Sequence, residues 1–132
     1  MSERDILKTS YQQLLSRYSG KTERMEIMDI ESTVKKYLPM SETAYLILLS
    51  LTEPRHGYGI SKWVKEKTND RISLGSGTIY GTLSKMEKDK LITVYNEVDN
   101  RIIYEITSRG KAVLKAEFER LSSLIDISKD II

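Results

Sequence analysis

The stretch from Leu74 to Gly81, LGSGTIYG, places three glycines just before and inside a segment with helical periodicity. Glycine-rich turns that lead into a helix can hold phosphate groups, because the first backbone N–H groups of a helix have no partner inside it. The stretch is therefore compatible with three structures: a nucleotide site, a helix that contacts DNA, or an ordinary tight turn.

The two common nucleotide motifs do not fit this stretch. A Walker loop needs a lysine and then Ser or Thr directly after its last glycine, but Thr78 and Ile79 follow Gly77. The spacing of Gly75, Gly77 and Gly81 is one residue too long for a dinucleotide fingerprint. What remains is a helix start that can hold one phosphate of DNA. We expect Gly75 and Gly77 to shape the turn and Gly81 to let the helix approach a groove wall.

The chain has few residues of the types needed for metal binding or catalysis. The chain has no cysteine, which excludes disulfides, thiolate metal sites and cysteine nucleophiles, and His56 is its single histidine. A metal site would need mostly carboxylate ligands, and a Ser/His/Asp triad would have to use His56. We therefore predict no metal, no cofactor and no enzymatic activity.

The charge of the chain permits nucleic-acid binding without requiring it. The formal net charge is +2 over 132 residues, and no long basic run is present. The longest hydrophobic run, Ala44–Leu49, is far shorter than a membrane span. We expect a soluble, cytoplasmic protein that does not associate with membranes.

The segment Thr78–Asp89 is predicted to be a helix with two different sides. At about 100° per residue, Ile79, Leu83 and Met86 form a narrow apolar stripe on one side. The opposite side carries Thr78, Gly81, Ser84, Lys85 and Lys88. Small hydroxyl side chains suit base edges or phosphates, and lysines neutralise phosphates, although an ordinary solvated helix side has a similar composition.

Helices are also predicted on the N-terminal side of this segment. Apolar residues recur at steps of three and four over Arg4–Tyr18, and again from a cap at Thr22 to the stop at Pro39. Ser41 can cap a third helix that is apolar on nearly every side, which predicts burial on two faces.

A turn separates the third helix from the next one. In Thr52–Gly57, proline prevents helix continuation and Gly57 is expected to supply backbone freedom. A short helix follows, in which Ile60, Trp63 and Val64 are expected to face inward.

The last third of the chain predicts a β-hairpin and a long helix. Two alternating runs, LITVYNEV and RIIYEIT, are separated by Asp99 and Asn100, which tolerate the positive φ of a two-residue turn. Ser108 can then cap a helix whose apolar seam steps by four, three and four residues: Leu114, Phe118, Leu121 and Ile125.

This order of elements is that of a winged helix-turn-helix, which places one helix in the DNA major groove and a hairpin beside it. We predict a mainly α fold with a small β-hairpin, in three parts: an N-terminal helical pair over residues 1–38, the winged helix-turn-helix over 39–107, and a C-terminal dimerisation helix over 108–132.

Three segments also resemble a known family. LPMSETAYLILLSLTEPRHGYGI, GSGTIYGTLSKMEKDKLI and YEITSRGKAVL are similar to the PadR family of bacterial transcriptional regulators, over roughly residues 38–125. The resemblance implies a winged helix-turn-helix, a homodimer formed with help from the C-terminal helix, and repressor activity that small aromatic or drug-like ligands relieve in some members. The sequence departs from the family at Ser76, where many members have proline, and in its first 33 or so residues.

Carried over by residue, the resemblance implies DNA contacts from Tyr58, Lys62, Ser76, Thr78, Tyr80, Lys85, Asn100 and Arg101. Tyr58 and Tyr80 have a second interpretation, since tyrosines in such places often close a core with the hydroxyl in water. For Trp63, a core position is favoured over a ligand-binding one.

The prediction is thus a homodimeric repressor that binds a near-palindromic DNA operator. We expect the dimer to join the seam Leu114, Phe118, Leu121 and Ile125 to the spare apolar side of Tyr45, Leu48 and Leu49. A small-molecule effector, if one exists, is expected near that interface. The alternative is a winged-helix module that binds protein and not DNA.

Overall fold

The computed structural model describes residues 20–132 of the chain. The chain divides into two compact units. The first unit is continuous, from Met40 to Lys111, and the second combines the described residues up to Pro39 with Ala112–Ile132.

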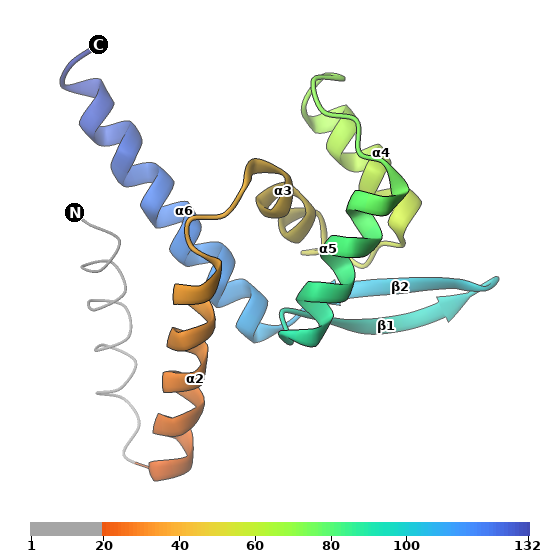
Figure 1. Cartoon of the computed structure of the whole chain (residues 1–132), viewed down its shortest axis with the longest axis horizontal. Coiled ribbons are helices and arrows are strands. Elements are labelled where there is room, and N and C mark those ends of the chain that lie inside the picture. The colour runs from red at the N-terminus through yellow and green to blue at the C-terminus, as the bar shows by residue number, and fades with distance from the viewer. Residues whose placement is uncertain (1–19) are drawn as a thin grey trace. The chain divides into compact units, whose positions relative to one another are not determined.

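The continuous unit, which we call the winged unit, is a helix-turn-helix followed by a hairpin (Figure 1). Its elements are α3 (Glu42–Ser50), α4 (Gly57–Lys67), α5 (Ser76–Lys88), β1 (Ile92–Val98) and β2 (Arg101–Ile106). In Figure 1 the three helices lie on one side of the hairpin, and the hairpin tip projects beyond them. This is the predicted mainly α architecture with one antiparallel hairpin, and it is confirmed.

The winged unit is held together by a core to which every one of its elements contributes. The apolar stripe predicted for α5 is buried, with exposed fractions of 3% for Ile79, 1% for Leu83 and 1% for Met86. The unit buries further apolar residues from its other elements and the turns beside them: Ile47, Leu48, Leu51, Ile60, Val64, Leu91, Ile92 and Ile106. Removing these side chains from water is the main force that fixes α5 against the unit.

Local signals set the ends of the elements. Ser41 is the N-cap of α3, and its hydroxyl accepts a hydrogen bond from the Ala44 N–H at 3.1 Å. Asp99 and Asn100 have φ values of 52° and 63°, as the predicted two-residue turn requires. The register of the hairpin shifts between Val94 and Asn96, which is typical of a β-bulge.

Three predicted helix starts move by one or two residues. The helix that was expected to begin at Thr78 begins at Ser76 and ends at Lys88. α2 begins at Lys21, so Thr22 lies within the helix and not at its cap. The last helix begins at Ser108, so this residue is not the cap either, and the hydroxyl of Thr107 accepts a hydrogen bond from the Gly110 N–H at 3.1 Å. The predicted helix over Arg4–Tyr18 lies outside the described residues.

The second unit contributes α2 (Lys21–Tyr37) and most of α6 (Ser108–Lys129). The buried side of α2 is formed by Ile27 and Val34, which repeat at helical spacing. On α6, the carboxylate of Glu117 is buried and is paired with Arg120 one turn later.

Candidate nucleic-acid interface

The outward side of α5 carries the predicted DNA-contacting residues in the expected position. All of them are exposed: Ser76, Thr78, Tyr80, Gly81, Ser84, Lys85 and Lys88. Gly75 is the N-cap of the helix and offers no side chain to the first turn. The N-terminus of α5 thus combines backbone N–H groups with hydroxyls, and lysines follow about two to three turns later, an arrangement suited to a polyanion.

The glycines of this helix are not explained by backbone geometry or by packing. Among the described glycines none has a positive φ, so Gly75 and Gly77 do not contribute to the turn through left-handed backbone. A Cβ at Gly75, Gly77 or Gly81 would meet nothing within 4 Å. A β-carbon would fit at each of these positions, so contacts within the chain do not require glycine there.

Gly57, at the start of α4, differs from these glycines because its surroundings are crowded. A Cβ at this position would lie 2.7 Å from the hydroxyl oxygen of Tyr80 and 2.9 Å from its Cζ. The sequence suggested that Gly57 gives backbone freedom, but its φ is not positive, and a side chain there would require the exposed ring end of Tyr80 to shift. The ring end of Tyr80 therefore rests on the first turn of α4 while 55% of the residue stays exposed.

Tyr104 of β2 adjoins the same part of α5. Burial raises the pKa of the Tyr104 hydroxyl, and the nearby Glu87 and Tyr80 raise it further. The phenol stays uncharged at neutral pH, so it acts as a neutral polar group beneath α5.

Helix α4 presents two of the predicted DNA-contacting side chains to solvent. Tyr58 is 71% exposed, so it does not close the core, and the alternative interpretation of this tyrosine is wrong. Lys62 is also exposed and lies 4.0 Å from Glu66, the limit of an ion pair, which is a weak interaction at a protein surface. Inward-facing Ile60 and Val64 are buried as predicted, while Trp63 is only half-buried.

The hairpin tip places Asn100 and Arg101 in solvent, at the turn. The guanidinium of Arg101 reaches back to α4, where its Nη1 lies 3.4 Å from Nε2 of His56. This contact was not predicted from the sequence, where His56 was considered only as a metal ligand or a catalytic base.

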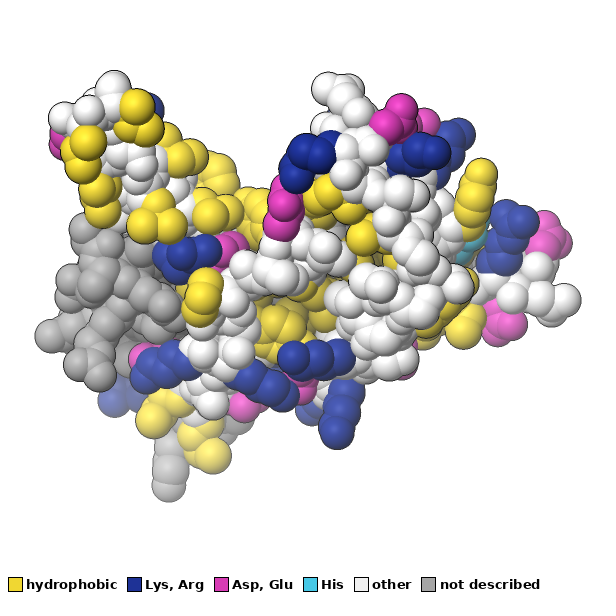
Figure 2. Space-filling view, turned by 45° about the horizontal axis from the view of Figure 1, so that its top comes forward, with side chains coloured by type: hydrophobic (Ala, Val, Ile, Leu, Met, Phe, Trp, Pro, Cys, Tyr) yellow, Lys and Arg dark blue, Asp and Glu magenta, His cyan; other side chains and the backbone are white. Residues whose placement is uncertain are grey.

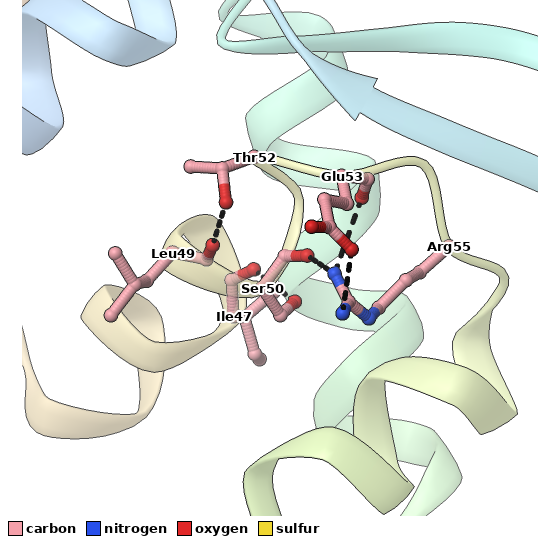
Figure 3. A network of polar contacts seen from close by, with 6 residues as sticks. All are labelled: Ile47, Leu49, Ser50, Thr52, Glu53 and Arg55. Carbon is pink, nitrogen blue, oxygen red and sulfur yellow. Dashed lines mark hydrogen bonds and ion pairs between the residues drawn. The ribbon is translucent and has the colours of Figure 1, made fainter. Parts of the chain in front are cut away.

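Arg55 joins the α3–α4 turn to the hairpin and was also missed from the sequence. Its side chain donates to the carbonyl oxygen of Ser50 and pairs with Glu53 at 3.4 Å (Figure 3). Its guanidinium lies 5.5 Å from the ring centre of Trp63, a cation–π contact. Its backbone exchanges two hydrogen bonds with Tyr104, at 3.0 and 2.9 Å. The turn is thereby fixed to β2.

An ion pair connects the loop between α4 and α5 to the start of α3. Arg71 hydrogen-bonds to Glu42 at the start of α3, and this bond lowers the pKa of the Glu42 carboxyl. Within the loop, the Ser61 hydroxyl donates to the Leu74 carbonyl oxygen at 3.3 Å. Both contacts restrict the chain that leads into α5.

The basic residues are dispersed over the winged unit. Figure 2 shows the Lys and Arg side chains, in dark blue, in separate groups, several of them beside acidic side chains in magenta. Among the described residues, no group of acidic and histidine side chains could hold a metal ion, and no helix is both long and apolar enough to cross a membrane.

The residues predicted for a dimer interface differ in their exposure. Phe118 and Ile125 of α6 are 59% and 56% exposed, while Leu114 and Leu121 are half-buried. On α3, Tyr45 and Leu49 are half-buried. Leu48 is completely buried within the chain, so its prediction as an interface residue is wrong: it belongs to the core of the winged unit.

The comparison with known families agrees with this geometry. Residues 46–116 match the transcriptional regulator PadR-like family, which is more than half of the chain. The chain belongs to the PadR-like family of transcriptional regulators. The predicted resemblance is thereby confirmed, and the matched region includes all of α4, α5 and the hairpin.

Relatives of this PadR-like protein include curated and solved proteins. An uncharacterised protein from Lysinibacillus sphaericus is 30% identical over 89 residues, which are 62% of this chain and 82% of that protein. A PadR-like transcription factor from Bacteroides fragilis has a similar structure, with a TM-score of 0.61 and 25% identity over 75% of this chain and 98% of the other. A transcriptional regulator from Clostridium thermocellum shares the fold, with a TM-score of 0.60 and 24% identity over 76% of this chain and 98% of its own.

Proposed function

We propose that this PadR-like regulator is a homodimeric repressor that binds a near-palindromic site in double-stranded DNA. The observation that carries the proposal is the outward side of α5, where hydroxyls and lysines are exposed over a buried apolar stripe. In this role α5 is the recognition helix. The two recognition helices of a dimer would enter successive major grooves about 34 Å apart.

Each part of the interface has its own task in the proposal. Thr78 and Ser84 face base edges or phosphates, and Lys85 and Lys88 neutralise phosphates. Tyr58 and Lys62 contact the backbone from α4, and the hairpin tip places Arg101 along the backbone or in a minor groove. These tasks require binding and no catalysis, and they place the protein with the DNA in the cytoplasm.

The homodimer is the part of the proposal that rests on α6. Phe118 and Ile125 lie on one side of α6 and are both exposed. Exposed apolar side chains of this kind are removed from water when a second apolar surface covers them, which favours association. Residues 108–132 are thus the proposed dimerisation helix, 39–107 the DNA-binding part, and 1–38 an N-terminal extension. A small-molecule effector near the dimer interface would act by changing the spacing of the two recognition helices.

A second candidate function has one observation in its favour. The hairpin exposes several apolar side chains, Val94, Tyr95, Val98 and Ile102. Aromatic and aliphatic anchors of this kind are common where proteins bind proteins. A winged-helix module that binds protein and not DNA would use the hairpin and leave the lysines of α5 in solvent.

Fluorescence anisotropy with a labelled duplex at low and moderate salt separates the two candidates. We expect the dimer to bind nonspecific duplex at low salt and to lose affinity steeply as salt rises, because bound phosphates release counterions. No binding at either salt by an intact dimer would exclude the DNA-binding proposal and favour the protein-binding module.

Two substitutions in α5 then test the assigned roles. Lys85→Ala should weaken binding to every sequence and lower the slope of log affinity against log salt by about one. Thr78→Ala should in addition reduce the preference for one base position in a selected binding site. If both substitutions cause the same loss on every sequence, the division between phosphate and base contacts is wrong.

A further inference from the structure

His56 and Arg101 form a contact between the helix-turn-helix and the hairpin tip. His56 is the N-cap residue of α4, and its side chain makes no capping hydrogen bond to that helix. Arg101 is the first residue of β2. Arg101 Nη1 lies 3.4 Å from His56 Nε2, although the two residues are 45 positions apart in sequence.

The backbone around this contact is fixed. Arg55, the residue before His56, exchanges hydrogen bonds of 3.0 and 2.9 Å with Tyr104 of β2. Residue 56 is thereby held beside the strand that starts at Arg101. The pairing of Val98 with Arg101 closes the hairpin just before the tip, so the base of the arginine side chain is also restrained.

The imidazole ring of His56 has an aromatic neighbour. It stacks with the ring of Tyr58, with centroids 6.3 Å apart and an interplanar angle of 27°. This neighbour restricts the imidazole on one side.

One tautomer of the imidazole allows a hydrogen bond across this contact. A guanidinium has only N–H donors, so it can hydrogen-bond to Nε2 of His56 only when the ring carries its proton on Nδ1.

We propose that His56 is a positioning residue for Arg101, and that its neutral imidazole holds the guanidinium in the orientation that meets DNA. The inference rests on the proposed DNA-binding function. A long arginine side chain loses rotamer freedom when it binds, and an acceptor that restrains it beforehand reduces that loss.

The first test uses the free protein. His56 is the single histidine of the chain, so its ¹⁵N ring signals need no further assignment. We expect a protonated Nδ1 and an unprotonated Nε2 at pH 8, and a change in that pattern in the Arg101→Ala variant. A proton on Nε2 in the unmodified protein would overturn the inference.

The second test measures the affinity for one fluorescein-labelled A·T-rich duplex at fixed salt, using the full-length chain. His56→Phe keeps an aromatic ring for the stack and removes the acceptor, and we expect it to weaken binding about 3- to 10-fold. His56→Gln restores an acceptor at similar reach and should recover most of the affinity. In an Arg101→Ala background, His56→Phe should cause no further loss.

The outcomes distinguish this inference from the proposed function. If the unmodified chain does not bind the duplex, both proposals fail. If the chain binds and Lys85→Ala weakens binding, but His56→Phe has no effect, the positioning role alone is wrong. An equal loss from His56→Phe with and without Arg101 would also overturn it, because His56 would then act independently of the arginine. Thermal unfolding of each variant checks that the fold is intact.

Discussion

The outward sides of α5 and α6 are both exposed, yet their chemistry is opposite. On α5, Thr78, Ser84 and Lys85 are open to solvent, and the aliphatic residues are buried beneath them. On α6, Phe118 and Ile125 are open to solvent at more than half of their surface. Both helices are amphipathic, but only the surface of α5 is already suited to water.

The difference indicates what each surface meets. Hydroxyls and lysines keep their hydration until a polyanion replaces it, so the α5 surface is stable alone and ready for DNA. A large exposed aromatic ring on a seam of apolar residues gains free energy when a partner covers it. The comparison thus supports a division of labour, with DNA binding on α5 and self-association on α6.

The largest expected effect comes from placing a charge on the α6 surface. Phe118→Lys should raise the dimer dissociation constant at least about 100-fold, because losing a buried phenylalanine costs about 3–5 kcal/mol in a packed interface. Analytical ultracentrifugation should then show a monomer, with circular dichroism unchanged because Phe118 is exposed in the chain.

Ile127→Lys is the matched control for that substitution. Ile127 is also exposed on α6, but nine residues from Phe118 it lies about 180° around the helix. We expect the Ile127→Lys protein to remain dimeric. A Phe118→Lys protein that is still dimeric would show that the α6 seam is not the interface.

An intermediate effect is expected where α5 rests on α4. Gly57→Ala would place a Cβ against the ring end of Tyr80, and we expect a cost of about 1 kcal/mol, the low end for overpacking, because the exposed ring can shift. Chemical denaturation should show this loss. Adding Tyr80→Ala should recover much of the stability, because the clash is removed.

Gly77→Ala serves as the control for Gly57→Ala, since a Cβ at Gly77 meets nothing within 4 Å. It should not destabilise the protein. Equal destabilisation by the two alanines, or no recovery with Tyr80→Ala, would contradict the role of the Gly57–Tyr80 contact in seating α5.

The smallest expected effect separates folding from binding within α5 itself. Gly81→Ala should raise the unfolding free energy by about 0.5–1 kcal/mol, because alanine favours a helix interior and the position is open. The same variant should bind duplex DNA more weakly in anisotropy if Gly81 allows close approach to the groove. Greater stability with unchanged DNA affinity would mean that Gly81 lies away from the bound DNA.

The sequence predicted the local features of the fold well. The inward stripe of Ile79, Leu83 and Met86 follows from helical periodicity alone, and the turn at Asp99 and Asn100 follows from their tolerance of positive φ. Both depend on residues a few positions apart, so no knowledge of packing is needed. The family resemblance depended in the same way on short motifs.

Predictions that depend on contacts between two distant segments were either not made or wrong. Leu48 was expected at an interface because its helix is apolar on almost every side, and only packing shows which side the core covers. Gly57 was interpreted as a flexible turn residue, whereas a side chain there would require the ring end of Tyr80 to shift. Both errors arise because a sequence pattern does not specify which element packs against which.

The amino-acid sequence by itself determined the elements, their order, the polar side of α5 and membership of the PadR-like family. Only the tertiary structure brought Arg101 to His56 and Arg55 to Tyr104. The physical reason is one of range: periodicity and turn preferences act over a few residues, whereas contacts between elements are decided by how the whole core packs.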